Sequence, residues 1–140
     1  MKKFTRMIII LLILALCTGC NSQGNKIDID IADLSNSESY NMVRSILLEA
    51  DKHVGKTIRM KGEFAHQEFD GVMYFVCITE HQTGHRNGIE FILKDAKFPD
   101  EYPTAGDTII VTGTFMKYTE NGEEYARLAN ATYEIVKEDD

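Results

Sequence analysis

The chain has 140 residues, of which 44% are hydrophobic, and this is enough for one domain with its own core. Its 22 acidic residues outnumber its 15 basic residues and give a formal net charge of −7. Because an acidic surface repels phosphate backbones, we do not expect the protein to bind nucleic acid.

The N-terminal segment has the pattern of a secretory signal. Three basic residues, at positions 2, 3 and 6, precede an apolar run from Met7 to Leu16. A membrane-spanning helix needs about 20 apolar residues, so this run is too short to remain in a bilayer. We therefore expect residues 1–19 to be a signal peptide. Its removal leaves 12 basic and 22 acidic residues, a net charge of −10.

The motif Cys17-Thr18-Gly19-Cys20 resembles the lipobox of bacterial lipoproteins, in which a small residue precedes a cysteine that is acylated on sulfur and becomes the new N-terminus. Gly19 matches the small residue and Cys20 the acylated cysteine, while Cys17 stands where such signals usually carry Leu. The resemblance implies a palmitate-type anchor at Cys20 that holds the protein on the exported side of a cell membrane or outer membrane. The alternative is an ordinary signal peptide cleaved near Gly19.

Residues 20–36 are rich in Asn, Ser and Asp, so we expect the acylated cysteine to be followed by a flexible tether. Ile27, Ile29 and Ile31 alternate with other residues there, and the alternative is a short edge strand. The folded domain is then expected to occupy residues 37–140.

A helical period follows the expected tether. Apolar residues recur at positions i, i+3, i+4, i+7 and i+11 from Val43 onward, which predicts a helix over residues 37–54. Ser35 and Glu38 have the spacing of a capping box at its start, and Ser39 is the alternative cap. Gly55 is expected to end the helix.

Residues 55–64 and 106–115 repeat one alternating phrase. In each, a glycine and a polar residue precede apolar residues at every second position, which is the period of a β-strand. Each phrase also has a glycine at an inward position, Gly62 in the first and Gly113 in the second. A strand that bends sharply or carries a bulge needs a glycine there, so we predict two bent strands of a small closed barrel.

The remaining strands are expected at residues 72–78, 89–93 and 123–129, with residues 131–135 extending or following the last one, and with polar loops at 65–71 and 80–87. Asn121-Gly122 is a strong hairpin signal between the fourth and fifth strands. Cys77 lies inside an apolar strand and cannot form an internal disulfide alone. We expect it to be a small buried hydrophobe, the alternative being a reactive thiol.

Five short strands, with long bent first and fourth members and a hairpin between the fourth and fifth, resemble the oligonucleotide/oligosaccharide-binding (OB) fold. The repeated phrases at 55–64 and 106–115 are similar to strands one and four of its anticodon-binding-like branch, as found in bacterial envelope lipoproteins. The resemblance covers about residues 57–133. It implies a mainly all-β, five-stranded OB-fold barrel with one N-terminal α-helix, and it implies no activity.

In this fold, ligands usually lie on strands two and three, between the first loop and the loop that joins strands four and five. The residues that this chain places there are aromatic and acidic: Glu68, Phe69, Tyr74, Glu123 and Tyr125. Such a surface suits a cationic peptide, a sugar or a neighbouring envelope protein better than a phosphodiester. We therefore expect a membrane-anchored, non-catalytic binding or accessory module that needs no cofactor.

The alternative function is a metal-dependent hydrolase. His81 and His85 lie near Glu80 in a polar loop, and imidazole and carboxylate groups are zinc ligands. His66 is expected in the loop at the opposite end of the barrel, where it cannot complete the ligand set. The sequence has no nucleophile-elbow pattern and no Gly-rich phosphate loop before a helix.

Overall fold

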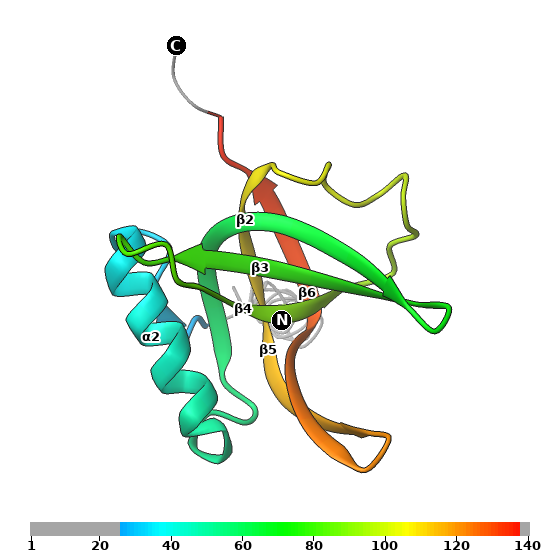
Figure 1. The fold of residues 1–140 in the computed structure, drawn as a ribbon, viewed down its shortest axis with the longest axis horizontal. Helices are drawn as coiled ribbons and strands as arrows, with labels where there is room; N and C mark the ends of the chain where they lie inside the picture. The colour runs from blue at the N-terminus through cyan, green and yellow to red at the C-terminus, as the bar shows by residue number, and fades with distance from the viewer. Residues whose placement is uncertain (1–25, 138–140) are drawn as a thin grey trace, which may run out of the picture.

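The computed structural model describes residues 26–137, so the expected signal peptide, Cys17 and Cys20 lie outside the described residues. This part of the chain is mostly β-structure with one α-helix (Figure 1). Between residues 26 and 137, no helix is long and apolar enough to span a bilayer. The elements in chain order are β1 Ile29–Asp30, α2 Asn36–Leu48, the 3-10 helix η1 Ala50–Lys52, β2 Thr57–Phe69, β3 Val72–Glu80, β4 Arg86–Leu93, β5 Thr108–Glu120 and β6 Glu123–Ile135.

Five of the strands form a closed ring. The sheet order is β1-β2-β3-β4-β6-β5, and β2 also pairs with β5, which closes the ring. Strand β2 pairs with β5 through its first half and with β3 through its second half. Glu63 pairs with both Thr108 of β5 and Ile78 of β3, so it marks the point where β2 changes partners. The prediction of a mainly β domain with one leading helix is confirmed.

The two inward glycines lie where strands approach most closely. A Cβ atom on Gly62 would lie 2.4 Å from the carbonyl oxygen of Ile78, which is closer than real Cβ contacts. A Cβ atom on Gly113 would lie 2.9 Å from the Cβ of Leu128, and the register of β5 against β6 shifts at this point. The prediction that each glycine marks a bend or a bulge is confirmed, because β2 changes partners directly after Gly62 and the register of β5 shifts at Gly113.

The core fills the ring with inward residues of all five strands. Its largest fully buried members are Phe64, Phe91, Phe115, Ile31, Ile46, Ile58, Met60, Ile89, Ile109, Leu128, Val43 and Val111. Val43 and Ile46 come from α2, which packs against β3 and β4 (Figure 1). Tyr102, from the segment between β4 and β5, stacks on Phe75 with ring centroids 4.0 Å apart and extends the aromatic core beyond the strands.

The prediction of a flexible tether is wrong for the residues that form β1. This strand pairs in parallel with Ile58 and Arg59 of β2, so the alternative of a short edge strand is what forms. Directly after it, Ile31 is 2% exposed and Ala32 is fully buried. The apolar surface buried by these residues, together with the backbone hydrogen bonds to β2, outweighs the entropy of leaving the segment free.

The predicted capping box at the start of the helix is confirmed, but the helix is shorter than expected. It ends at Leu48 instead of continuing to Val54, which is 51% exposed. Glu49 leaves the helical conformation, with φ −115° and ψ 36°, and one 3-10 turn follows. This early end turns the chain back so that the N–H of Gly55 donates to the carbonyl of Phe115 (2.8 Å), which starts β2 beside β5.

The prediction of a loop at residues 65–71 is wrong. Strand β2 continues to Phe69, and a tight turn follows at Asp70-Gly71. The φ angles of these two residues are 49° and 76°, values that Asp and Gly tolerate in a two-residue hairpin turn. His66 therefore lies within β2, opposite Phe75, and not in a loop.

The hairpin predicted at Asn121-Gly122 is confirmed and joins β5 to β6. Strand β6 then runs without interruption through Asn130, whose φ angle is 49°. Of the two alternatives for residues 131–135, extension of the fifth strand is the one that forms.

We expect Gly62→Ala to destabilise the protein by about 2–3 kcal/mol, because the added Cβ pushes β2 away from the Ile78 carbonyl. Gly122→Ala is the control. Nothing lies within 4 Å of its added Cβ, so only the strain of a positive φ angle remains, about 1 kcal/mol. Urea unfolding followed by circular dichroism measures both losses, and equal midpoints would show that the crossing at Gly62 is not crowded.

Candidate ligand-binding groove

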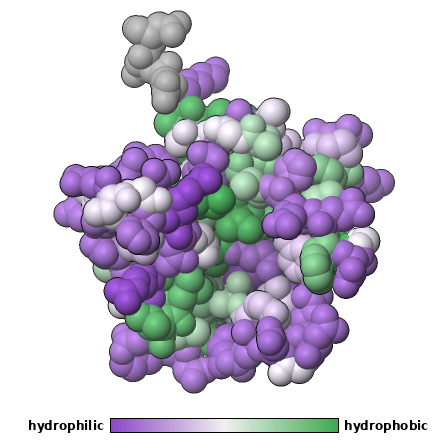
Figure 2. Space-filling view, viewed as in Figure 1, coloured by the Kyte–Doolittle hydropathy of each residue, from purple (hydrophilic) through white to green (hydrophobic). Residues whose placement is uncertain are grey.

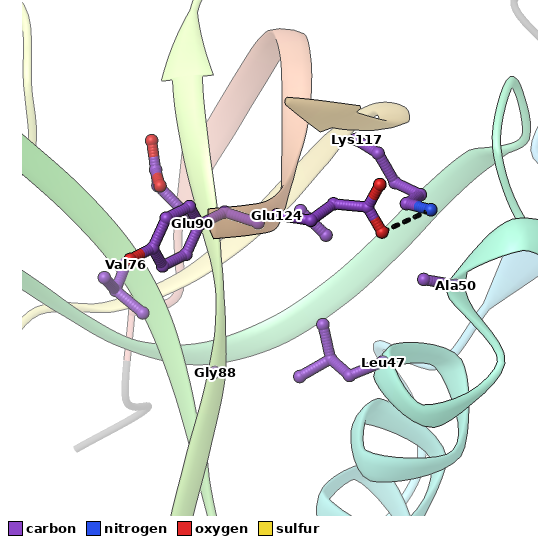
Figure 3. Close-up of a pocket in the computed structure, with 9 residues that line it drawn as sticks. Leu47, Ala50, Val76, Gly88, Glu90, Lys117 and Glu124 are labelled. Carbon is purple, nitrogen blue, oxygen red and sulfur yellow. Dashed lines mark ion pairs between the residues drawn. The ribbon is translucent and has the colours of Figure 1, made fainter. Parts of the chain in front are cut away.

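A hollow opens between the C-terminal end of α2, the outer faces of β3 and β4, and the β5–β6 hairpin (Figure 3). Its volume is about 430 Å³, and it is lined by Leu47, Ala50, Val76, Gly88, Glu90, Lys117, Glu124, Tyr125 and Ala126. A second cavity of about 440 Å³ shares four of these residues and continues past the helix end, along Glu49, Asp51 and Lys52. We call the two cavities together the groove. Figure 2 shows apolar surface in the hollow of this face, with polar residues around it.

The walls of the groove follow from the sequence pattern. Val76 and Glu90 lie opposite each other in the β3–β4 ladder. They point outward because their neighbours Cys77 and Ile89 point into the core. Leu47 forms the facing wall, since it lies at the edge of the apolar stripe of α2 and is only half-buried. The groove therefore has an apolar wall on one side and a carboxylate on the other.

Glu90 is the central polar group of the groove. Its side chain is only 16% exposed, and its Oε2 accepts a hydrogen bond of 2.5 Å from the hydroxyl of Tyr118. The guanidinium of Arg127 lies 3.5 Å from the centre of the Tyr118 ring, and its Nε lies 3.7 Å from Oε1 of Glu90. Within residues 26–137, Arg127 Nε is buried without a hydrogen-bond partner, and Oε1 accepts no hydrogen bond. One oxygen of this largely buried carboxylate is thus hydrogen-bonded, and the other is ion-paired with Arg127 but can still accept a hydrogen bond.

Three tyrosine hydroxyls on this face donate hydrogen bonds to carboxylates: Tyr118 to Glu90, Tyr74 to Glu120 (2.8 Å) and Tyr125 to Glu123 (2.7 Å). The pKa of Tyr118 is raised above its usual value, chiefly by burial and then by the bond to Glu90. The pKa values of Tyr74 and Tyr125 are raised chiefly by their carboxylate partners. The rings of Tyr118 and Tyr125 stack with centroids 5.6 Å apart, which gives the groove a rigid aromatic border.

Lys117 connects the two sides of the groove. Its Nζ lies 2.5 Å from a carboxylate oxygen of Asp51 in η1 and 2.5 Å from one of Glu124 on β6 (Figure 3). These two hydrogen bonds hold the pKa of Lys117 above its usual value. Asp51 is 86% exposed, so water screens this bridge and its contribution to stability is small.

The groove is acidic. Six carboxylates lie in or beside it, against three cationic side chains: Glu49, Asp51, Glu90, Glu120, Glu123 and Glu124 against Lys52, Lys117 and Arg127. Helix α2 adds partial negative charge, because its C-terminal end borders the groove and its last turn has no basic residue. The electrostatics therefore favour a cationic ligand.

Of the predicted site residues, Tyr125 lines the groove, and Tyr74 and Glu123 lie beside it through their hydrogen bonds. Glu68 and Phe69 do not line it, because they lie next to the turn of the β2–β3 hairpin. Phe69 is 60% exposed there.

Sequence reasoning missed Glu90, Lys117 and Tyr118 as site residues. A signal for Glu90 was present, since it is a charged residue between the buried Ile89 and Phe91 and must therefore lie on the outer face of its strand. The partners of Glu90 come from the β5–β6 hairpin, about 30 residues later in the chain. No local sequence pattern predicts which residues of that hairpin contact β4.

The predicted loop histidines share one hydroxyl. Thr83 Oγ1 lies 2.9 Å from Nδ1 of His81 and 2.7 Å from Nδ1 of His85. The carboxylate of Glu80 instead faces Arg86, at 3.7 Å. In the part of the chain that the structure describes, no three His, Cys, Asp or Glu side chains come together as a metal-binding group, so these residues do not form the expected ligand set.

No protein-family model matches this chain, and comparison with curated proteins finds no match. The groove and its charges are therefore the basis for assigning a function.

Tyr118→Phe tests the buried phenol. Because the pKa of Tyr118 is raised in the folded state, its contribution to stability is fully present below the ordinary tyrosine pKa of about 10 and is lost as the pH rises through that value and beyond. We expect the wild-type protein to lose more unfolding free energy than Tyr118→Phe between about pH 9 and about pH 11. Urea unfolding at several pH values measures this.

The matched control is Tyr133→Phe, because the Tyr133 hydroxyl makes no hydrogen bond within the described residues. It should follow the wild-type pH dependence. A Tyr118→Phe curve parallel to the wild-type curve would contradict the buried hydrogen bond.

Cys77 is fully buried, and burial raises the pKa of its thiol to about 12. The thiol therefore stays protonated at about pH 8, where a free cysteine is partly ionised. We expect Ellman's reagent to leave Cys77 unmodified in the native protein and to modify it within seconds in urea. Rapid labelling without denaturant would show that the thiol is reactive and that the buried-hydrophobe prediction is wrong.

Proposed function

We propose that this protein is a lipid-anchored binding module of the bacterial envelope that acts without catalysis. In this proposal its ring of strands is a five-stranded OB-type barrel, and its ligand presents a cationic group to the groove. The observation that carries the proposal is Glu90, whose carboxylate is fixed on one oxygen by Tyr118 while the other oxygen lacks a hydrogen bond within residues 26–137.

The strand arrangement supports the OB assignment. Strands β2 and β5 are long and bend or bulge at Gly62 and Gly113. Residues near the turn of the β5–β6 hairpin contact β3 and β4, because Tyr118 bonds Glu90 and Glu120 accepts a hydrogen bond from Tyr74. Ligands of OB folds bind between the corresponding hairpin and sheet face.

The N-terminal sequence supports the anchor. Its basic flank, short apolar run and lipobox-like end resemble bacterial lipoprotein signals. Only five residues separate Cys20 from the first described residue, Lys26. Such a spacer reaches at most about 20 Å, so an acylated Cys20 would hold the start of the domain close to the membrane surface, where neighbouring envelope molecules are concentrated.

The state of the carboxylates supports binding rather than proton transfer. Glu120, Glu123 and Glu124 already accept hydrogen bonds from this chain. Each of these carboxylates is therefore fixed in position and presents negative charge to a cationic group of a ligand. Among peptide, sugar and protein partners, the acidity favours a peptide or protein segment that carries Lys or Arg.

The anchor is tested by metabolic labelling with a palmitate analogue in a bacterial host. We expect the wild-type protein to incorporate the label and to fractionate with membranes, and Cys20→Ser to remain unlabelled. A Cys17→Ser variant is the matched control and should keep the label. Labelling of Cys20→Ser, or none in the wild type, would remove the lipid anchor from the proposal.

The groove is tested by nuclear magnetic resonance titration of the protein with pentalysine at physiological salt. We expect chemical-shift changes that are confined to the groove, and about tenfold weaker binding to Glu90→Gln, because a charge-assisted hydrogen bond is lost. Glu134→Gln is the control, since this exposed residue lies on β6 far from the groove. Equal affinity of the two variants, or tighter binding of a single-stranded oligonucleotide, would overturn the proposal.

A further inference from the structure

We infer that the ligand is an extended, basic peptide segment that adds as a strand between β4 and β6. This inference rests on the proposed function, because it places the peptide in the same groove. It goes further by assigning the main interaction to backbone hydrogen bonds, with the carboxylates selecting basic side chains.

The sheet is open where the groove lies. The parallel ladder between β4 and β6 begins only at Glu90 and Arg127. The preceding residues, 86–89 of β4 and 123–126 of β6, pair with β3 and β5 but not with each other. The groove lies between these two segments, and its lining includes Gly88. The ring thus has two strand edges that diverge from a common point and leave space between them.

The backbone groups of Gly88 point into this space. Gly88 lies opposite Ile78 in the β3–β4 ladder, but the Ile78 carbonyl points toward β2, because it comes within 2.4 Å of a Cβ built on Gly62. In an antiparallel pair, two opposite residues either bond to each other or both point away, so the Gly88 N–H points away from β3. It donates instead to the side-chain oxygen of Asn87, at 2.9 Å.

The backbone groups of Ala126 point into the space from the other side. The Ala129 carbonyl points toward β5, since it lies 3.1 Å from a Cβ built on Gly113. Backbone groups alternate between the two edges of a strand, and the register of β5 against β6 is regular from Ala129 to Ala126. The N–H and C=O of Ala126 therefore point away from β5. One inserted strand could bond to Gly88 and Ala126 at the same time.

The charges in the groove indicate which peptide fits. Basic side chains on one face of an inserted strand would meet Glu90, whose Oε1 has no hydrogen bond within residues 26–137. The alternate face would meet the apolar wall at Leu47 and Ala50. Glu124 belongs to this second face, because it shares the inward side of β6 with Leu128, and its carboxylate is already paired with Lys117. A segment that alternates basic and apolar residues matches both faces.

Side chains of this chain also block the open strand edges against unspecific pairing. An open strand edge invites pairing with other chains, and proteins commonly block such edges with charges or side-chain contacts. The side-chain oxygen of Asn87 accepts a hydrogen bond from the Gly88 N–H. Lys117 and Glu124 place charges beside the free edge of β6. A peptide must displace the Asn87 side chain, so this residue limits the affinity.

The test compares two peptides by isothermal titration calorimetry with the full-length protein in detergent. The first is blocked Lys-Val-Lys-Val-Lys, and the second is the same peptide with its middle residue N-methylated, which keeps every charge but blocks one edge of the strand. We expect the first to bind and the second to bind at least about tenfold more weakly. Hydrogen exchange at Gly88 and Ala126 should slow only in the first complex.

The outcomes separate this inference from the proposed function. If both peptides bind equally and neither amide is protected, strand addition is wrong while cation binding by the groove remains. If neither peptide binds and pentalysine also fails, both proposals are wrong. Protection of the two amides together with loss on N-methylation supports strand addition.

A substitution at Asn87 tests strand addition independently of the peptide chemistry. Asn87→Ala frees the Gly88 N–H, so we expect the unmethylated peptide to bind several-fold more tightly than to wild type. Asn41→Ala, on the exposed face of α2, is the matched control and should leave the affinity unchanged. Unchanged or weaker binding by Asn87→Ala would overturn the assigned strand geometry.

Discussion

The structure depends on the change of partner within β2. One strand pairs with β5 through its first half and with β3 through its second, and this alone closes the ring. The change is possible because Gly62 has no side chain where β2 meets the Ile78 carbonyl. The inward residues of all five strands pack in one core, so this crossing holds together the walls that enclose it.

The closed ring also explains the groove. A strand ring closed through β2 and β5 leaves β4 and β6 paired over only part of their lengths. The unpaired segments separate where the β5–β6 hairpin continues beyond the ring, and the end of α2 lies across the opening (Figure 1). A buried backbone N–H or C=O group without a hydrogen-bond partner destabilises the fold. The backbone groups at the unpaired edges of β4 and β6 must therefore bond to water, to a side chain or to another chain. Asn87 provides the cap in this structure.

The fold was largely predictable because its strands have strict alternation and its special positions carry glycine. Gly62, Gly113 and the Asn121-Gly122 turn could each be assigned from local chemistry. The tether prediction failed because the polar composition of the segment hid the packing of Ile31 against the core. Likewise, no local signal shows that the helix must end early for β2 to start beside β5.

The site was harder to predict, because it is built from residues that meet only in three dimensions. Glu90, Tyr118 and Arg127 come from three strands, and their contacts depend on the curvature of the β5–β6 hairpin. Aromatic and acidic residues near the expected loops could be chosen from the sequence, and Tyr125 does line the groove. Phe69 had the same composition signal, but a tight turn instead of a loop places it next to the end of a hairpin.

The proposed anchor and the proposed strand addition reinforce each other energetically. The carboxylates Asp51 and Glu124 are exposed to water, so an ion pair between them and a basic side chain of a partner would contribute little to binding. A short added strand in such a groove is expected to bind modestly, because its ordering entropy offsets most of the backbone hydrogen bonds. If the module and its partner share one membrane surface, their effective concentration is high, and modest affinity is sufficient for occupancy. In this proposal the lipid anchor raises the local concentration of the partner and so offsets the low affinity of the groove. The low affinity in turn lets the module release one partner and bind another.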